Sequence, residues 1–265
     1  MGTCTFFNAE PVADFYQAYQ GGQGIDFVWA LSGSNRGRNG EGKNNGKPCD
    51  RCAGDPIDLS TGNEFMEEND YAMSPSLARY YNSQDTGSGH FGSNWRHTYD
   101  EQLLYLAEGS PGGVTAILHK PDGKDIGFDK TNGTWAPDSD VSDTLQEVDG
   151  PAGTPISWIF FNSTLQRTDV FDNSGLWTSS VDQNGHTLAL TYSDASTPTS
   201  IAPQTGLLLS VTDEKGRLLQ FSYNQRGLVS AVTLPDGSHI SYTYDYPIVA
   251  LLSATYADNT SRNYI

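Results

Sequence analysis

Two cysteines at a C-x-x-C spacing, Cys49 and Cys52, are the residues of this sequence with the clearest potential for chemistry. This spacing occurs in zinc sites, redox pairs and local disulfides. A tetrahedral zinc site needs two more ligands, and the sequence has no second C-x-x-C, which leaves Cys4 with His90 or His97 as candidates. Because only half of a zinc motif is present, three interpretations of the pair remain: a structural metal site, a disulfide, or ordinary thiols. We expect no catalytic role for the pair.

Two further motifs match catalytic signatures only in part. Residues 85–87 spell the Asp-Thr-Gly triplet of aspartic proteases, whose chemistry needs two carboxylates that share a proton. The triplet has no second copy, and its Gly- and Ser-rich surroundings predict a loop. Gly37, Gly42 and Lys43 have P-loop spacing, but Asn44 replaces the hydroxyl residue that would hold magnesium. We therefore predict that neither motif is an active site and that the chain is not an enzyme.

Carboxylates and tyrosines suggest two kinds of binding site. Residues 138–143 contain closely spaced aspartates that could hold calcium, but they lack the glycine and the terminal glutamate of an EF-hand, so a solvated acidic loop is expected. Four tyrosines would line a sugar-binding groove if they were exposed. Their alternation along predicted strands favours a core-facing position instead. These residues are Tyr192, Tyr223, Tyr242 and Tyr244.

The charge balance limits the partners of the chain. Its 265 residues contain 15 Lys and Arg against 32 Asp and Glu, a formal net charge of −17. Binding of a nucleic acid backbone needs clustered basic residues and is therefore not expected. No run of apolar residues is long enough to predict a membrane span. The N-terminus lacks the basic and apolar regions of a signal peptide, so we expect secretion or surface display to need a dedicated secretion system.

The chain divides into three stretches, residues 1–53, 54–165 and 166–265. In the first, apolar residues at helical spacing over 12–19 predict a short helix, and a Gly- and Asn-rich linker follows. In the second, short apolar runs alternate with turn residues, which predicts strands at 103–106, 114–118 and 158–161. The predicted fold class is all-β, with antiparallel hairpins and a short, partly helical N-terminal segment.

The third stretch contains a repeat. After each of three glycines, apolar residues occupy the third, fifth and seventh following positions, and an Asp or Asn lies within three positions before the glycine. Such an element predicts a tight turn, because glycine accepts a positive φ, followed by a strand with one apolar face. A fourth glycine in the second stretch begins the same pattern. The glycines are Gly185, Gly216, Gly237 and, incompletely, Gly123.

These repeats resemble a known family. The stretches 212–218 and 234–245, which end in Tyr244-Asp245, are similar to YD repeats. The segment 54–63, followed by Arg79-Tyr80-Tyr81-Asn82 and by 95–100, resembles the start of the RHS-repeat region of bacterial RHS proteins. The resemblance covers residues 54–265. Residues 54–165 then form an opening β-region and residues 166–265 form YD-repeat hairpins, after an N-terminal segment of residues 1–53.

The resemblance implies a spiral β-sheet that closes into a hollow shell around a toxin or other cargo. We therefore expect a non-catalytic shell segment that needs no cofactor, with the rest of a shell and an effector cargo as partners. The sequence ends inside a further repeat-like unit and lacks the Asp-Pro-x-Gly signature of shell closure, so we expect an open sheet edge that pairs with other chains. The alternative is a cell-surface module that binds a carbohydrate or a protein, as family members in cell contact do.

Overall fold

A computed structural model describes residues 57, 62–85, 88–106, 115–246 and 248–264. The predicted N-terminal helix, the linker and Cys49 and Cys52 lie outside the described residues. Within them every regular element is a strand, as the all-β prediction requires, and no helix has the length and hydrophobicity of a membrane span. The strands are β1 (Phe65–Tyr71), β2 (Leu77–Asn82), β3 (Ser88–Gly89), β4 (Gly92–Ser93), β5 (Trp95–His97), β6 (Gln102–Leu106), β7 (Thr115–His119), β8 (Asp125–Thr131), β9 (Thr134–Pro137), β10 (Thr144–Asp149), β11 (Pro155–Asn162), β12 (Arg167–Asp172), β13 (Trp177–Asp182), β14 (Thr187–Tyr192), β15 (Leu208–Asp213), β16 (Leu218–Tyr223), β17 (Val229–Thr233), β18 (His239–Asp245), β19 (Ala250–Thr255) and β20 (Ser261–Asn263).

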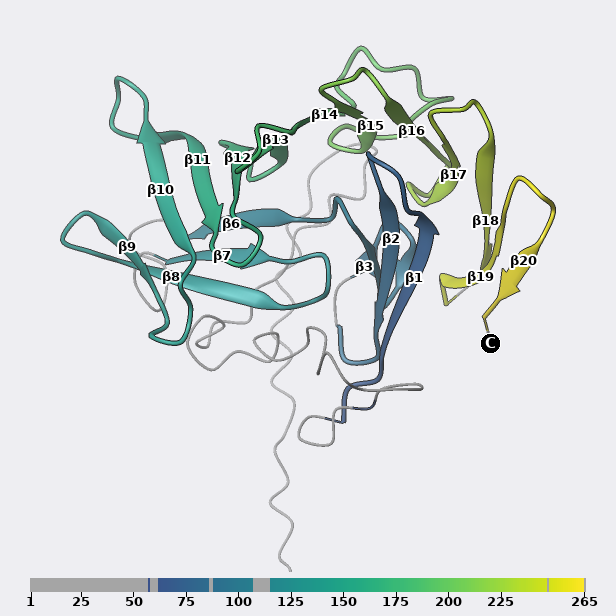
Figure 1. Cartoon of the computed structure of the whole chain (residues 1–265), viewed down its shortest axis with the longest axis horizontal. Coiled ribbons are helices and arrows are strands. Elements are labelled where there is room, and N and C mark those ends of the chain that lie inside the picture. The colour runs from purple at the N-terminus through teal and green to yellow at the C-terminus, as the bar shows by residue number, and fades with distance from the viewer. Residues whose placement is uncertain (1–56, 58–61, 86–87, 107–114, 247, 265) are drawn as a thin grey trace, which may run out of the picture.

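The largest element is an eleven-stranded antiparallel sheet in which β10 to β20 follow one another in chain order. Figure 1 shows that β13 to β20 form an arc, with β1 and β2 on its inner side. The sheet includes β10 and β11, so it begins before the 166–265 stretch in which the sequence repeat was recognised. A sheet built from successive hairpins has only local connections, and each new hairpin extends the arc by two strands.

One turn geometry recurs at the hairpins. At residues 213–217 the backbone N–H of Asp213 donates to the carbonyl of Arg217, and Gly216 N–H donates back to Asp213. Gly216 has a φ of +76°, so the turn is a hairpin loop closed by a left-handed glycine. The Asp213 carboxylate accepts two further backbone N–H groups, at 3.0 and 2.9 Å, and fixes the loop. The same backbone pair closes the turns that begin at Asp172, Asp182 and Asn224.

The apolar positions predicted after the glycines face the core, as expected. In β16, Leu219, Phe221 and Tyr223 are buried, and the residues between them are more exposed. The same alternation holds for the apolar positions of β18. The strands predicted at 103–106, 114–118 and 158–161 are β6, β7 and β11, and residues 194–205 form the predicted loop between β14 and β15.

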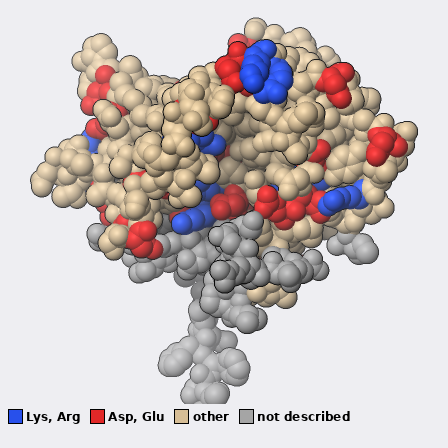
Figure 2. Space-filling view, in the orientation of Figure 1, with Lys and Arg blue, Asp and Glu red and all other residues tan. Residues whose placement is uncertain are grey.

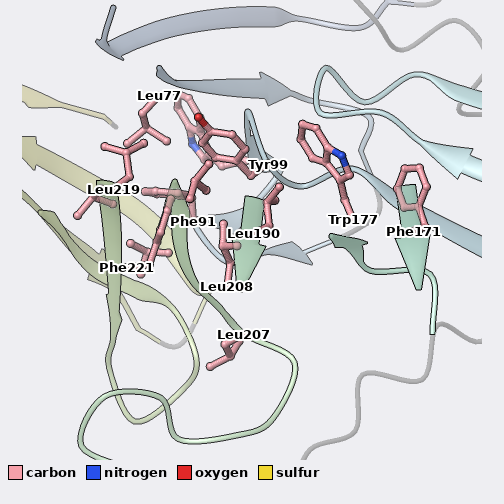
Figure 3. Packing of buried hydrophobic residues seen from close by; sticks show 14 of the residues in the cluster. Leu77, Phe91, Tyr99, Phe171, Trp177, Leu190, Leu207, Leu208, Leu219 and Phe221 are labelled. Atoms are coloured by element: carbon pink, nitrogen blue, oxygen red, sulfur yellow. The ribbon is translucent and has the colours of Figure 1, made fainter. Parts of the chain in front are cut away.

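The strands before β10 form separate small sheets that pack against the large sheet. One contains β1, β2 and β5, another contains β6 to β9, and β3 pairs with β4. The buried side chains of all these sheets and of the arc form one hydrophobic cluster. Figure 3 shows Phe91 and Tyr99 of the opening region pointing toward Leu219 and Phe221 of the arc. The opening region therefore fills the space beneath this part of the sheet.

Candidate functional site

The motifs that resembled catalytic or metal sites do not converge in the described residues. Asp85 is buried and binds Arg96 in a bidentate ion pair, with Arg96 Nε and Nη2 donating at 2.5 and 3.0 Å. Asp143 accepts from the backbone N–H and the hydroxyl of Ser163, both at 2.8 Å. Among the described residues, no three His, Cys, Asp or Glu side chains are grouped for metal binding. The P-loop-like glycines, Thr86 and Gly87 lie outside the described residues.

The four repeat tyrosines are packed into the core, as their alternation predicted. Tyr223, Tyr242 and Tyr244 are buried, and Tyr192 packs against the core cluster. Burial raises the pKa of these phenols, so they stay neutral donors. Such residues cannot line an exposed sugar-binding groove.

Three of these hydroxyls make the same long-range bond. Each donates to a backbone carbonyl fifteen residues earlier, at 2.6–2.8 Å. The bond ties the end of one strand to the start of the strand before it, and we call it the tyrosine tie. The pairs are Tyr192 to Trp177, Tyr223 to Leu208 and Tyr244 to Val229.

The fourth tyrosine, Tyr242, belongs to a buried ion pair between the opening region and the last repeats. Arg79 of β2 donates to Asp70 of β1 through Nε and Nη2 at 2.6 and 2.9 Å, and both side chains have no exposed surface. Tyr242 and Tyr256 of the arc donate their hydroxyls to the same carboxylate, each at 2.8 Å. Arg79 Nη2 also donates to Tyr264 at 2.9 Å. We call these five residues the Asp70–Arg79 lock.

Aromatic rings enclose the cation of this lock. The guanidinium carbon of Arg79 lies 5.1–5.9 Å from the ring centroids of Phe91, Trp95, Tyr242 and Tyr264. Burial by itself would lower the pKa of Arg79, but the bonds and charge of Asp70 raise it, so the guanidinium stays charged. Removal of either partner would leave an uncompensated buried charge and would therefore destabilise the fold.

A second charged cluster lies where the sheet of β6 to β9 meets β12 of the large sheet. Glu101 accepts from Lys120 at 2.8 Å and from Arg167 at 3.1 Å, and Arg167 also pairs with the buried Asp169. Burial and the nearby Glu101 charge raise the pKa of Asp169 to about 6. Arg167 lies 4.7 Å from the centroid of Trp177. Two carboxylates and two cations neutralise one another here. In Figure 2, most of the basic side chains on the visible face lie beside acidic ones.

Backbone contacts complete the seam between the opening region and the arc. Val229 N–H donates to the carbonyl of His90 at 2.8 Å, and Ser93 N–H donates to Val249 at 3.0 Å. Leu103 N–H donates to Gly175 at 3.0 Å. A Cβ on Gly175 would lie only 1.7 Å from the Leu103 carbonyl oxygen, so this position requires glycine. The arrangement holds two parts of the chain together.

Sequence reasoning missed most of this seam. Arg79 lies within a family motif, whereas its partner Asp70, nine positions earlier, lies in none, and a tyrosine of the lock is 186 positions away from Asp70. The available signal for the lock was Arg79, a charged residue in an otherwise apolar and aromatic segment. For Gly175, the sequence contained no signal beyond the turn in which the glycine lies.

Comparisons with known proteins support the resemblance. A family model described as RHS Repeat matches residues 204–239, and one described as Domain of unknown function (DUF6531) matches residues 54–128. A crystal structure titled TcdB2-TccC3-Cdc42 is similar over 74% of this chain and 11% of that chain, with 12% identity and a TM-score of 0.27. The chain thus spans about a tenth of that longer polypeptide. No curated protein sequence matches the chain.

Proposed function

We propose that this chain, which matches the RHS Repeat model over residues 204–239, is a non-catalytic structural segment of an RHS-repeat shell that scaffolds or encloses a toxin or effector. The observation that carries the proposal is the eleven-stranded sheet in strict chain order, with its inner side covered by the opening region. The buried ion pairs described above neutralise one another, and tyrosines of the arc bond to Asp70 and Arg79 across the seam. Such groups serve to build and close a wall.

The seam supports this assignment through its position. The Asp70–Arg79 lock connects the first hairpin of the described chain to the last repeats. A wall that must stay closed around a cargo needs such connections between elements distant in sequence, because a sheet of local hairpins has only nearest-neighbour contacts. The tyrosines that suggested a sugar-binding groove are packed into the core, so they do not support that alternative.

The test begins with the native protein in its source, detected with an antibody against residues 54–265. The proposal expects a polypeptide or assembly far above 28.8 kDa, in which additional peptides resist protease until the wall is cut. A native product near 28.8 kDa that protects no other polypeptide would contradict the enclosure of a cargo by this chain. Binding to a neutral glycan array by that product would then favour the surface-module alternative.

A matched pair of variants sharpens the protease experiment. Asp70→Asn removes the charge that holds the lock and should make the protected peptides sensitive to protease earlier. Asp258→Asn makes the same chemical change in an exposed turn and should leave protection unchanged. Equal protection in both variants would show that the seam does not keep the wall closed.

A further inference from the structure

Three connections of the large sheet lie together at one end of its strands, and we call them the rim. They are the loop 193–207, the turn 224–228 and the loop residues 246, 248 and 249. Asn224 Nδ2 donates to the hydroxyl of Tyr246 at 3.1 Å. A Cβ on Gly227 would lie 3.0 Å from Nε2 of Gln204. The turn 224–228 therefore adjoins a loop on each side.

The rim exposes large apolar side chains. Ile201 and Tyr246 are each 44% exposed, and Ile248 is 65% exposed. The described turns at the opposite end of the same strands, 213–217, 234–238 and 256–260, contain no exposed large apolar residue. Exposed apolar side chains are therefore not a general property of the connections in this sheet. Their gathering at one end indicates an interaction surface.

Arg226 of the rim lies over the ring of Tyr246, with its guanidinium carbon 4.2 Å from the ring centroid. Asn224 holds both residues, because its Nδ2 bonds to Tyr246 and its Oδ1 accepts the backbone N–H of Arg226 at 2.9 Å. Each of the other five described arginines forms an ion pair with a carboxylate. The Arg226 side chain forms no ion pair or hydrogen bond with a described residue. The stack therefore orders a guanidinium whose donors no described carboxylate engages.

A guanidinium ordered in this way fits a carboxylate. Its planar donor fork binds both carboxylate oxygens at once, and the stack on Tyr246 reduces the side-chain entropy that is lost on binding. The side chains of Ile201 and Ile248 favour an apolar group beside that carboxylate, because they offer no hydrogen bond to a sugar hydroxyl. Arg226 also covers one face of the Tyr246 ring, on which a sugar would otherwise stack.

We propose that the rim docks an acidic segment of another polypeptide, in which Arg226 binds a carboxylate and an apolar side chain next to it packs against Ile248 and Tyr246. The net charge of −17 repels an acidic partner. Repulsion between exposed charges is screened beyond about 8 Å at physiological ionic strength, so the local contact decides the binding. This docking site is additional to the proposed wall and does not depend on it.

The test is an NMR titration of the isotope-labelled 265-residue chain with two blocked dipeptides as probes. N-acetyl-leucyl-aspartate amide should shift the signals of Arg226 and Tyr246 in a saturable way. N-acetyl-leucyl-asparagine amide has the same shape without the charge and should bind at least roughly tenfold more weakly. Arg226→Gln should weaken binding of the aspartate peptide by a similar factor. Lys215→Gln, which removes an exposed cation at the opposite end, should bind it like the unmodified chain.

The proposal is overturned by the absence of saturable shifts at the rim, by equal affinity for the two dipeptides, or by unchanged affinity in Arg226→Gln. If that variant does not fold, the comparison of the two dipeptides on the unmodified chain decides alone. N-acetylneuraminic acid, a carboxylated sugar, is the third probe. Tighter binding of this sugar than of the aspartate peptide at the same residues would assign the site to an acidic saccharide and refute a polypeptide partner. None of these measurements involves a cargo, so the proposed function keeps its own test.

Discussion

Substitution of Asp70 by asparagine tests the balance of charges inside the lock. The carboxylate accepts four hydrogen bonds, two from Arg79 and one each from Tyr242 and Tyr256. Asparagine removes the negative charge and leaves the buried guanidinium unpaired. Breaking one side of a buried ion pair costs about 3–5 kcal/mol, a large part of the roughly 5–15 kcal/mol that stabilises a typical domain. The expected decrease in Tm is about 6–20 °C for a chain of this size.

The measurement is urea unfolding followed by tryptophan fluorescence, because Trp95 lies 5.1 Å from the Arg79 guanidinium. Asp258→Asn, which keeps an acceptor oxygen in an exposed turn, should leave the unfolding midpoint close to that of the unmodified chain. Arg79→Met and the double variant Asp70→Asn/Arg79→Met complete a double-mutant cycle. The loss of unfolding free energy in the double variant should be clearly smaller than the sum of the losses in the two single variants. A cost below about 1 kcal/mol for Asp70→Asn, or strict additivity, would refute the reasoning.

Three further predictions concern the turns, the tyrosine tie and acid. Gly175→Ala should destabilise more than Gly237→Ala in denaturant titrations, since both glycines have positive φ but only the first Cβ meets a backbone carbonyl; equal costs would contradict this. Tyr223→Phe should cost about 1 kcal/mol through the lost bond to Leu208, measured by thermal unfolding. Burial would raise the pKa of Asp213, but hydrogen bonds from Arg217 lower it to about 2, so the stability that it contributes disappears as pH falls from 3.8 toward 2. Asp213→Asn should make the stability of the chain less dependent on pH in that range.

The hairpins could be predicted from the sequence because their determinants are local. A glycine with a positive φ, an Asp or Asn before it and alternating apolar residues after it lie within about ten positions. The turns at Gly175 and Gly227 escaped this pattern. A register shift in each following strand places its buried residues, such as Val229 and Val232, at the second and fifth positions instead.

The seam could not be predicted in the same way. Asp70 and Tyr242 meet only after the whole arc has folded, since 172 positions separate them. No periodicity in a single sequence records such a contact. Physical reasoning could mark Arg79 as a charge inside an apolar and aromatic strand, but Asp70 stands among other acidic and polar residues. The choice of partner is a property of the tertiary arrangement.

The tyrosine tie has a consequence for how such a chain can change over evolutionary time. The offset of fifteen residues is the same in three hairpins, although the loops that connect the hairpins differ in length. Each hairpin therefore carries its own internal attachment, from the end of its second strand to the start of its first. Duplication or deletion of a whole unit would preserve these attachments, whereas a single-residue insertion within the fifteen would break one. The sheet can therefore gain or lose a whole hairpin without breaking the tyrosine ties of the others.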